Sequence, residues 1–398
     1  MTLVSIAERL GQEDFLARSL HRDYVLVRGA VAEPGALVSF GTVNDLIATH
    51  RLEPPRLRLS ADAEMVPQHR YAVPVVTRRH TVWQRIHTAE LHQQLAKGAS
   101  LVLDAIDELH EPIAELAQHL EGWLRTRVQV NAYASWTASE GFGTHWDDHD
   151  VIVVQIDGSK RWRLFSPTRT APLYKDTAEP NPPPEQPLAD VVLHPGDLLY
   201  LPRGWWHAVS ADQGTASLHL TCGLTPHTGA DLVGWLSEDL RSRDRIRTDL
   251  PLHATPAERA AYLTELRTLV LDALDDPTLL DRFAAARDAE DPGRPRPSLP
   301  HLTEVPARAD LQVRLTTGRA RLTDARDDDG QQVARFTAAG QEIDFAPAVT
   351  PLLHQLLCGG WHPLADLAHP DGISLADAAA IVTELVRIQA ASVRDGAR

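Results

Sequence analysis

The sequence is poor in cysteine and has no long apolar segment, and each absence excludes a class of protein. Its 398 residues include only two cysteines, Cys222 and Cys358, which excludes a disulfide framework and fits a reducing compartment. No run of about 18 apolar residues occurs, so we expect no membrane-spanning helix. The first residues lack the basic and apolar regions of an export signal. We therefore expect a cytoplasmic protein.

Positive charge is scarce relative to negative charge. The chain has 54 acidic and 39 basic side chains, which gives a formal net charge of −15. Such a chain is a poor general binder of nucleic acid but attracts basic polypeptides, although solubility alone also explains the charge. The length predicts two or three structural units, and 43% hydrophobic residues suffice for their cores.

Two histidines and one carboxylate form the most informative pattern in the chain. His145 and Asp147 are separated by one residue, and His207 follows a Pro-Arg-Gly-Trp-Trp segment. Because side chains alternate along a β-strand, His145 and Asp147 can bind one metal from one strand end. Two histidines and a carboxylate are the ligands of a mononuclear non-haem iron(II) site with positions open for a co-substrate and dioxygen. The pattern favours an oxygenase, but a chain with 19 histidines also produces such a triplet by chance.

The segments around these residues predict β-strands. Residues 151–156 form a β-branched apolar run typical of a buried strand, Asp157-Gly158 is a hairpin signal, and residues 160–165 are predicted to be the return strand. A Pro-Gly turn then starts a short apolar strand that ends at a proline, after which a tight loop delivers His207. Both halves would place their ligands at strand ends of an antiparallel barrel.

Four ordered motifs lie between Asn131 and Leu224. They are His145-x-Asp147-x-x-Asp150-Val151, Gln155-x-x-Gly158-x-Lys160-Arg161-Trp162-Arg163, Pro195-Gly196-Asp197-x-Leu199-Tyr200-x-Pro202-x-Gly204-x-x-His207 and Ser217-x-His219-Leu220-Thr221. The motifs resemble the JmjC domain of the 2-oxoglutarate-dependent oxygenases, and within that group the ribosomal oxygenases. The resemblance implies a mainly β fold with helices, in which residues 1–227 form a JmjC domain. The core at about 127–224 would be a double-stranded β-helix barrel of the jelly-roll or cupin type.

The resemblance also implies roles for individual residues. His145, Asp147 and His207 would hold Fe(II) as the catalytic centre, with 2-oxoglutarate and dioxygen as co-substrates. Lys160 stands where relatives pair a basic residue with the distal carboxylate of 2-oxoglutarate, and a dicarboxylate in an apolar barrel needs such a countercharge. An ordinary surface lysine is the alternative. Further residues match or alternate toward the co-substrate pocket, with turn or core positions as the alternative: Asn131, Tyr133, His219 and Thr221.

A helical region is expected at residues 228–290. Thr255-Pro256-Ala257-Glu258 is a capping box with proline at the first helical position, which predicts a helix from Thr255 to about Leu274. Its apolar stripe consists of Tyr262, Leu263, Leu266, Leu269, Val270 and Leu274. Ribosomal oxygenases are similar here, with a helical dimerisation region after the barrel. We expect a homodimer, with packing on the barrel as the alternative.

The end of the chain resembles the winged-helix tail of the same family. Residues 291–300 form a linker by composition, and residues 301–398 would be a winged-helix-like domain. A strand is expected from 307 to 322, helical stretches near 351–357 and 363–368, and a capped helix from Ser374. The tail has nine arginines, no lysine and thirteen acidic residues, so direct DNA binding is not expected.

Three functions from different classes fit these observations. The first is hydroxylation of a protein side chain, with a basic ribosomal protein as partner. The second is the same chemistry on a small molecule or a peptide natural product. The third is a metal-binding cupin-like regulator without turnover, although a non-catalytic barrel has no need of Lys160 as a dicarboxylate anchor. The proline-rich segment 179–187 is expected to be an exposed loop near the substrate entrance.

Overall fold

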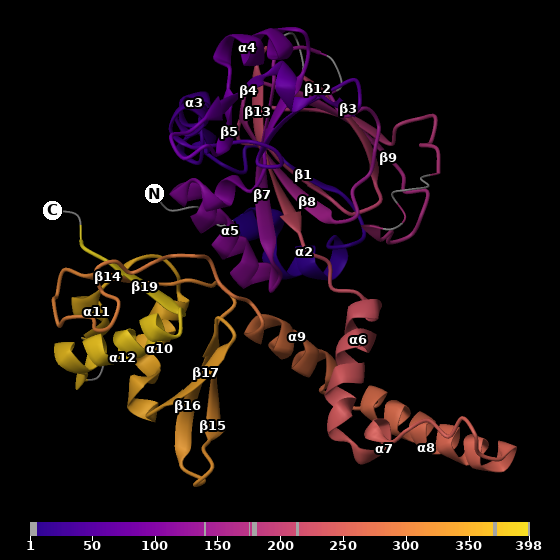
Figure 1. The fold of residues 1–398 in the computed structure, drawn as a ribbon, viewed down its shortest axis with the longest axis vertical. Helices are drawn as coiled ribbons and strands as arrows, with labels where there is room; N and C mark the ends of the chain where they lie inside the picture. Colours follow the sequence, from indigo (N-terminus) through magenta and orange to yellow (C-terminus); the bar gives the residue numbers. More distant parts are fainter. Residues whose placement is uncertain are drawn as a thin grey trace. The chain divides into compact units, whose positions relative to one another are not determined.

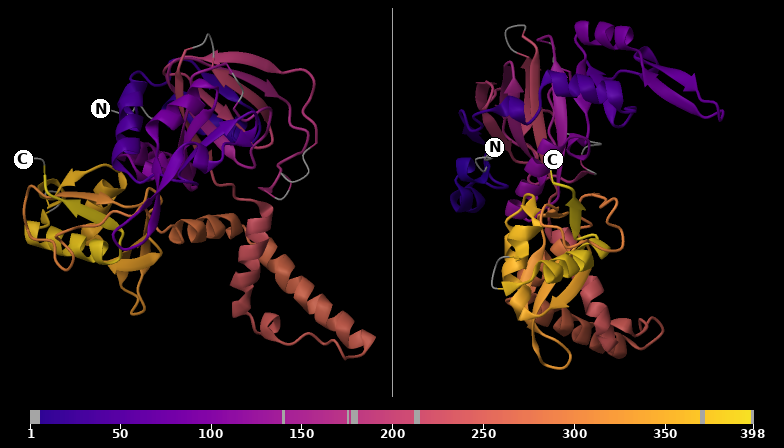
Figure 2. Two further views of the ribbon diagram at one scale, coloured as in Figure 1. Left: turned by 45° about the horizontal axis from the view of Figure 1, so that its top comes forward. Right: turned by 90° about the vertical axis from the view of Figure 1, so that its left-hand side faces the viewer.

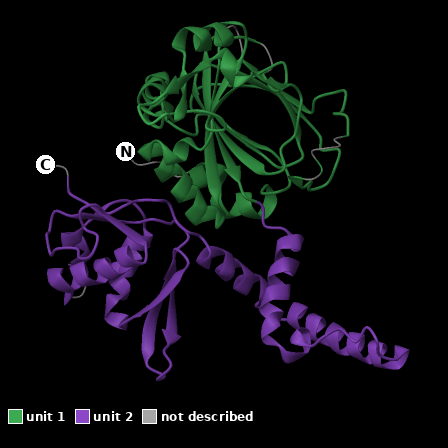
Figure 3. Cartoon of the chain, in the orientation of Figure 1, with its two compact units in different colours: residues 1–225 green, residues 226–398 purple. Residues whose placement is uncertain are grey.

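The computed structural model describes residues 6–138, 141–174, 176, 181–211, 215–368 and 372–396. The chain forms two compact units, residues 1–225 and 226–398 (Figures 1 and 3). The first unit is mainly β with helices, and the second contains a helical region followed by an α/β region. No helix among the described residues combines the length and the apolar character needed to cross a membrane.

Two sheets face each other in the first unit and form the expected barrel (Figure 1). The larger sheet has eight strands in the order β1-β11-β8-β13-β7-β6-β2-β3, and the smaller has the order β10-β9-β12. The strands of the larger sheet are β1 (Val25–Val27), β2 (Leu57–Ala61), β3 (Glu64–Met65), β6 (Ser100–Leu103), β7 (Val128–Ser135), β8 (Asp150–Asp157), β11 (Leu198–Leu201) and β13 (Ser217–Leu224). Those of the smaller sheet are β9 (Lys160–Phe165), β10 (Ala189–Leu193) and β12 (Trp206–Ala211). Neighbouring strands are antiparallel throughout.

The prediction of a hairpin at Asp157-Gly158 is wrong, because the two predicted strands exist but do not pair with each other. β8 pairs with β11 and β13, whereas β9 pairs with β10 and β12, so the turn carries the chain from one sheet to the other. Gly158 makes this crossing with φ of +61°, and a Cβ added there would lie 1.8 Å from the carbonyl oxygen of Ala216. The residues of the turn predict that the chain reverses direction there. Which strand each arm pairs with is decided by the packing of the whole barrel.

Helices and one separate hairpin surround the barrel. They are α1 (Ile6–Leu10), α2 (Gln12–Arg18), α3 (Phe40–Thr49), α4 (Thr88–Ala96) and α5 (Glu111–Leu124), with the hairpin of β4 (Ala72–Val76) and β5 (Val82–Ile86). α5 buries Ile113, Leu116 and Leu120, which recur at helical spacing along one face. The exposed-loop prediction for 179–187 is tested only from residue 181, because 179 and 180 lie outside the described residues. Residues 181–187 form no helix or strand.

The helical region of the second unit contains α6 (Gly229–Asp239), α7 (Asp244–Arg247), α8 (Pro256–Leu274) and α9 (Leu279–Ala289). The capping box is present, because Glu258 N–H donates to Thr255 Oγ1 and Thr255 N–H donates to Glu258 Oε2. The apolar stripe of α8 is not one buried face. Val270 packs against a small core that includes Leu236 and Leu279 of its neighbours, whereas Leu263 and other leucines remain exposed.

The α/β region of the second unit has its own core. A three-stranded sheet of order β18-β14-β19 packs with three helices, and a meander of β15, β16 and β17 is added to it. The elements are β14 (Gln312–Leu315), β15 (Arg321–Arg326), β16 (Gln332–Ala338), β17 (Gln341–Phe345), α10 (Thr350–Leu357), β18 (His362–Pro363), α11 (Leu364–Ala368), α12 (Leu375–Arg387) and β19 (Ala391–Arg394). The strand expected from 307 to 322 is therefore two strands of different sheets. The winged-helix assignment stays a prediction.

The expected linker at 291–300 is not a free spacer. Arg294 N–H donates to the carbonyl of Thr316 at 2.8 Å, and Val393 N–H donates to Ser298 Oγ at 3.1 Å. The segment forms no helix or strand, and its backbone and side-chain groups make hydrogen bonds to the residue that follows β14 and to β19 of the same unit.

Candidate active site

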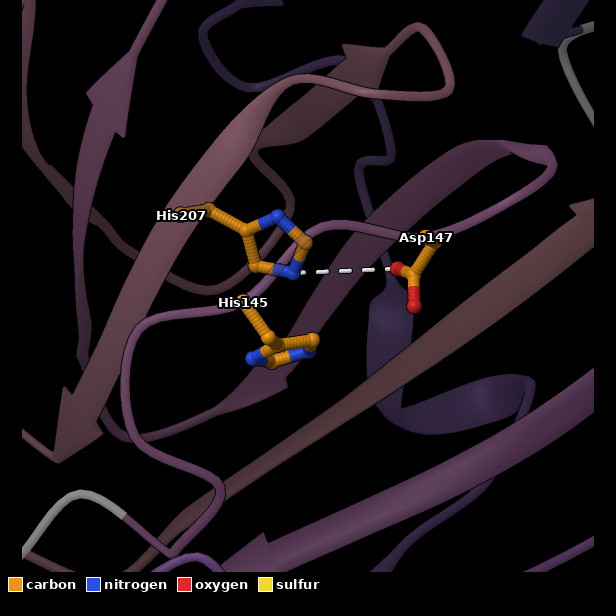
Figure 4. Close-up of side chains that lie close together, drawn as sticks. All are labelled: His145, Asp147 and His207. Atoms are coloured by element: carbon orange, nitrogen blue, oxygen red, sulfur yellow. Dashed lines mark ion pairs between the residues drawn. The ribbon is translucent and has the colours of Figure 1, made fainter. Parts of the chain in front are cut away.

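Three potential metal ligands lie together in the first unit (Figure 4). One ligand atom from each of His145, Asp147 and His207 lies within 4.8 Å of the others, and His207 Nε2 is 3.7 Å from Asp147 Oδ2. Among the described residues, no other group of three histidine, cysteine or acidic side chains has this spacing. The structure thus brings together the ligand set expected from the sequence.

Only one ligand position follows the expectation of strand ends, because His207 lies at the start of β12 whereas His145 and Asp147 lie outside any strand. His145 forms only an isolated bridge with His207, and Asp147 lies in the loop that leads into β8. His207 belongs to β12 itself. Two backbone hydrogen bonds join His145 and His207, of 3.0 and 2.7 Å, while Gly204 N–H donates to the carbonyl of Asp147 at 2.9 Å. The two ligand segments hold each other in register, which explains how a loop places ligands accurately.

A buried carboxylate ties the same segments to the start of the chain. Asp150 Oδ1 accepts from Arg203 N–H at 3.0 Å, and its other oxygen accepts from the Tyr200 hydroxyl. His21 Nδ1 is 2.7 Å from that second oxygen. Asp150 therefore links the loop after Asp147 to the turn before His207, which gives a structural role to an acidic residue of the first motif.

Both histidine rings are oriented by backbone carbonyls. His145 Nδ1 is 3.1 Å from the carbonyl of Gly143, and His207 Nδ1 is 3.1 Å from the carbonyl of Trp205. A carbonyl can only accept, so each Nδ1 carries the hydrogen and each Nε2 keeps a free lone pair. This arrangement orients metal-binding histidines and selects their tautomer.

The charges of the cluster also suit a cation. Burial lowers the pKa of His207 to about 4, so its ring is neutral and able to bind a metal at neutral pH. Burial alone would raise the pKa of Asp147, but His207 and His145 hold that pKa below its ordinary value. The site therefore offers two imidazole nitrogens and one carboxylate, the donor set of non-haem iron(II).

A cavity extends from the three ligands into the barrel, and Lys160 forms part of its wall. The Lys160 side chain is 4% exposed, and its ammonium donates to Ser135 Oγ. Burial lowers the pKa of Lys160 to about 8. Within the described part of the chain Lys160 has no acidic partner, and a buried cation without one favours an anionic ligand. The alternative of an ordinary surface lysine is wrong.

Three of the four further predicted residues line the same cavity, namely Tyr133, His219 and Thr221. Tyr133 and His219 are paired across β7 and β13, and their rings stack with centroids 5.1 Å apart. Burial raises the pKa of Tyr133 to about 12, so its hydroxyl keeps its hydrogen. Burial, with Lys160 nearby, lowers the pKa of His219 well below its ordinary value. The wall is therefore polar but uncharged at these positions.

Asn131 is not among the residues that line the cavity. Its Oδ1 accepts from Ala105 N–H at 2.9 Å and from Gln129 Nε2 at 3.0 Å. It also interacts with Tyr133, two residues further along β7. Asn131 lies on the same face of β7 as Tyr133, where it contacts Tyr133 and the turn after β6, and its place in the co-substrate pocket stays a prediction.

Several lining residues were not predicted, among them Arg58, Phe142 and Trp162. Trp162 follows Lys160 by two residues on β9, so strand alternation could have identified it. Arg58 has no such signal, because β2 lies far from the motifs in the sequence. Its guanidinium donates two hydrogen bonds to Asp104, of 2.6 and 3.1 Å, and lies 5.8 Å from the ring centre of Phe142. Because Asp104 neutralises its charge, Arg58 adds little net positive charge to the cavity wall.

The cavity fits a metal-bound dicarboxylate. His219 Nδ1 and Trp162 Nε1 are buried, and neither has a hydrogen-bond partner within the described part of the protein. Buried polar atoms are almost always paired, so these two and the Lys160 ammonium indicate a polar ligand between them. 2-Oxoglutarate, with one carboxylate near the metal and one near Lys160, would supply acceptors for such groups.

Comparison with known proteins agrees with this reading of the site. A JmjC domain model matches residues 107–232. The bifunctional lysine-specific demethylase and histidyl-hydroxylase NO66 of Drosophila persimilis is 37% identical over 109 residues, which cover 27% of this chain and 16% of that protein. Rat ribosomal oxygenase 2 is 31% identical over 192 residues, 45% of this chain and 41% of that protein. The chain thus spans less than half the length of these relatives.

Solved structures extend the likeness to the whole chain. The Escherichia coli ribosomal oxygenase YcfD matches with a TM-score of 0.62 and 19% identity over 97% of this chain and 98% of that one. A structure of YcfD in complex with cobalt and 2-oxoglutarate matches with a TM-score of 0.60, 19% identity and coverage of 96% and 97%. Residues 107–232 are therefore a JmjC domain, in a chain that has the fold of a ribosomal oxygenase.

Proposed function

We propose that the protein is an Fe(II)- and 2-oxoglutarate-dependent dioxygenase. The observation that carries the proposal is the cavity that joins His145, Asp147 and His207 to the buried ammonium of Lys160. A metal-binding regulator would need the ligands alone. The pairing of an open metal site with a buried anion-binding group is what the co-substrate requires.

Separate residues would bind the iron, the co-substrate and the substrate. His145, Asp147 and His207 would hold iron, and Lys160 with Ser135 would hold the distal carboxylate of 2-oxoglutarate. With these bound, the chemistry supplied is decarboxylation of 2-oxoglutarate to succinate, coupled to insertion of one oxygen atom from dioxygen into a substrate C–H bond. Tyr133 lies on the cavity wall beside Arg58, where its hydroxyl can donate to a substrate group.

A polypeptide is the substrate that the observations favour, and a ribosomal protein is the proposed source. The relatives named above are described as a histidyl-hydroxylase and as ribosomal oxygenases. The net charge of −15 would attract basic segments of the kind found in ribosomal proteins. We further propose that two chains associate through the helical region, because α8 keeps exposed leucines that the chain itself does not cover.

The test measures two products with the same preparation. Protein loaded with iron(II) is incubated with 2-oxoglutarate and with ribosomal proteins from its own source. Succinate release and a gain of one oxygen atom on a peptide are then measured by mass spectrometry. The Asp147→Ala variant is the control, because loss of its carboxylate removes both a ligand and the charge that offsets the metal. Equal succinate release from the variant would overturn the metal assignment.

Succinate and the oxidised peptide test different parts of the proposal, the dioxygenase chemistry and the ribosomal substrate. Succinate release without any modified ribosomal peptide would keep the dioxygenase and reject the ribosomal substrate. No succinate from the iron-loaded wild-type protein, with or without a substrate, would reject the dioxygenase itself.

A further inference from the structure

Positive charge is concentrated in one surface segment of this acidic protein. Residues 65–89 contain four arginines, three histidines and no acidic residue, although the chain as a whole has a net charge of −15. The segment includes the β4–β5 hairpin, whose strands pair with each other and with no other described strand. The right-hand view of Figure 2 shows this purple hairpin extending away from the barrel. Segregated basic charge on a projecting element indicates an anionic partner.

The hairpin exposes apolar side chains together with its arginines. Val75 pairs with Trp83, and Val73 pairs with Arg85 one step along the same face. Trp83 is 46% exposed, and both valines on this face are also exposed. An isolated two-stranded hairpin gains little stability in water, and an exposed aromatic and aliphatic surface usually marks an interaction site. Solvation alone therefore does not explain this composition.

A groove beside this face adds further polar and aromatic side chains. It lies against α3 and α4, and its walls include His50, Arg51, Trp83, Arg85 and His92. The Arg51 guanidinium lies 4.2 Å from the centre of the Trp83 ring, where it holds the indole in place by a cation–π contact. Arg51 is paired with Glu53 at 2.7 Å.

The four arginines of residues 65–89 have a different environment, three of them in the hairpin and Arg70 just before it. Within the described residues Arg70, Arg78, Arg79 and Arg85 form no ion pair. Their charge is not neutralised by the protein, in contrast to Arg51. Free guanidinium groups pair with phosphate through two parallel hydrogen bonds, which gives both charge and geometry to the contact.

We propose that the β4–β5 hairpin and its groove bind single-stranded RNA. The arginines at the hairpin turn, Arg78 and Arg79, contact phosphates, while Trp83 offers a ring on which an unpaired base stacks. From Val82 to Arg85 strand β5 spans about 10 Å, and the turn with Arg78 and Arg79 extends the surface beyond it, which accommodates a short stretch of nucleotides. A run of aspartate and glutamate would use the charges but offers no ring that stacks on the indole. The surface does not include the residues of the proposed catalytic cavity.

The test is fluorescence anisotropy with a labelled, unstructured 15-nucleotide RNA and the full-length protein. Arg78→Gln with Arg79→Gln should weaken binding at least tenfold at low salt, and should reduce the slope of log affinity against log salt concentration by about 1.4, since each lost phosphate contact removes about 0.7. Trp83→Ala should weaken binding by about fivefold to a hundredfold with an unchanged salt slope. These two signatures distinguish phosphate contacts from base stacking.

Matched controls identify the surface. Arg18→Gln with Arg22→Gln removes two exposed arginines of the same unit and should leave RNA affinity unchanged. Circular dichroism and succinate release should be normal in the Arg78 and Arg79 variant, whose changes lie in a turn. If Trp83→Ala unfolds, Trp83→Leu replaces the stacking ring with another apolar side chain and serves the same purpose.

Four outcomes would overturn the proposal. The first is no binding by the wild-type protein at about 100 µM, the weak limit of ordinary non-specific association. The second is equal affinity of the Arg78 and Arg79 variant and the wild type. The third is competition by a polyglutamate peptide as effective as that by unlabelled RNA, which would indicate a general polyanion surface. The fourth is equal affinity for a fully paired RNA duplex, which would exclude base stacking.

Discussion

At the scale of single residues, the buried ammonium of Lys160 is the most consequential group after the metal ligands. Its side chain is 4% exposed, and its hydrogen bond to Ser135 Oγ does not neutralise the charge. A buried cation is costly when it lacks a countercharge. Binding of a dicarboxylate relieves that cost, which makes co-substrate affinity depend on this residue.

Lys160→Ala should therefore weaken 2-oxoglutarate binding by roughly 3 to 5 kcal/mol, the cost of leaving one side of a desolvated charge pair without its partner. Lys160→Arg should lose less, because the charge is kept while its geometry changes. The measurement is the 2-oxoglutarate concentration that gives half-maximal succinate release. Arg161→Ala is the matched control, because Arg161 points to the exposed face of β9 and pairs with Asp190. Equal requirements in the Lys160→Ala and wild-type proteins would move the anchor to another residue.

The lowered pKa of Lys160 predicts a pH dependence. Its pKa in the unliganded protein is about 8, below the ordinary value of 10.5. Below pH 8 the ammonium is charged and binds the dianion directly. As pH rises through 8 the free site loses its proton and must regain one to bind, so affinity should fall by up to about tenfold per pH unit. The ionisation of 2-oxoglutarate does not change in this range.

Calorimetric titration of the cobalt-loaded protein with 2-oxoglutarate from pH 7 to 9.5 measures this effect. In Lys160→Arg the decline should disappear, since arginine stays protonated throughout. A decline of the same size in both proteins would assign the titration to another group.

At the scale of structural elements, the turn between β8 and β9 decides whether the two sheets can face each other. Gly158 has φ of +61°, and an added Cβ would approach the carbonyl oxygen of Ala216 to 1.8 Å. The obstacle is backbone, which cannot rotate away as a flexible side chain can. The crossing therefore requires glycine for its conformation and for its lack of volume.

Gly158→Ala should lower the free energy of unfolding by on the order of 3 kcal/mol or more, as strain at positive φ adds to the collision. Gly29→Ala separates the two contributions, because Gly29 has φ of +58° and a Cβ added there would meet no atom within 4 Å. The Gly29 variant should lose only about 1 kcal/mol. Urea denaturation followed by tryptophan fluorescence measures both, and equal losses would show that the close approach to Ala216 is unimportant.

At the scale of the whole molecule, the helical region explains why a second chain is expected. Leu263 and Leu274 lie on the same side of α8 and are 61% and 45% exposed. Val270 instead packs against its own helical neighbours, although the sequence places it in the same stripe. The apolar residues of α8 thus serve two purposes, an internal core and an uncovered surface.

Leu263→Asp with Leu274→Asp should yield folded monomers, because charge would enter the uncovered surface alone. Leu266→Asp with Val270→Asp should also reduce the helical content of the region, since Val270 belongs to its core. Light scattering gives the mass and circular dichroism the helix content. A wild-type protein that has monomer mass at micromolar concentration would refute the dimer, and a dimer that survives the first pair of changes would place the interface elsewhere.

Sequence spacing predicted the parts of the site that lie close together along the chain. The ligand triplet at His145 and Asp147, the later His207 and the lysine that opens β9 all belong to short motifs with recognisable neighbours. The family resemblance placed Tyr133 in the pocket, and alternation along β13 added His219; both line the cavity. Asn131 satisfies the same alternation on β7 but is not among the residues that line the cavity, because alternation predicts a face and not how far along the strand the cavity extends.

Helix caps, strand periods and the metal-binding residue types were thus determined by the sequence alone, because they are local properties. Only the tertiary structure decided that β8 and β9 belong to different sheets, that Arg58 of β2 reaches the cavity, and that the β4–β5 hairpin stands apart with its arginines unpaired. Those facts depend on which distant segments meet. Contacts between distant segments are selected by packing of the whole barrel, which no local pattern of residues encodes.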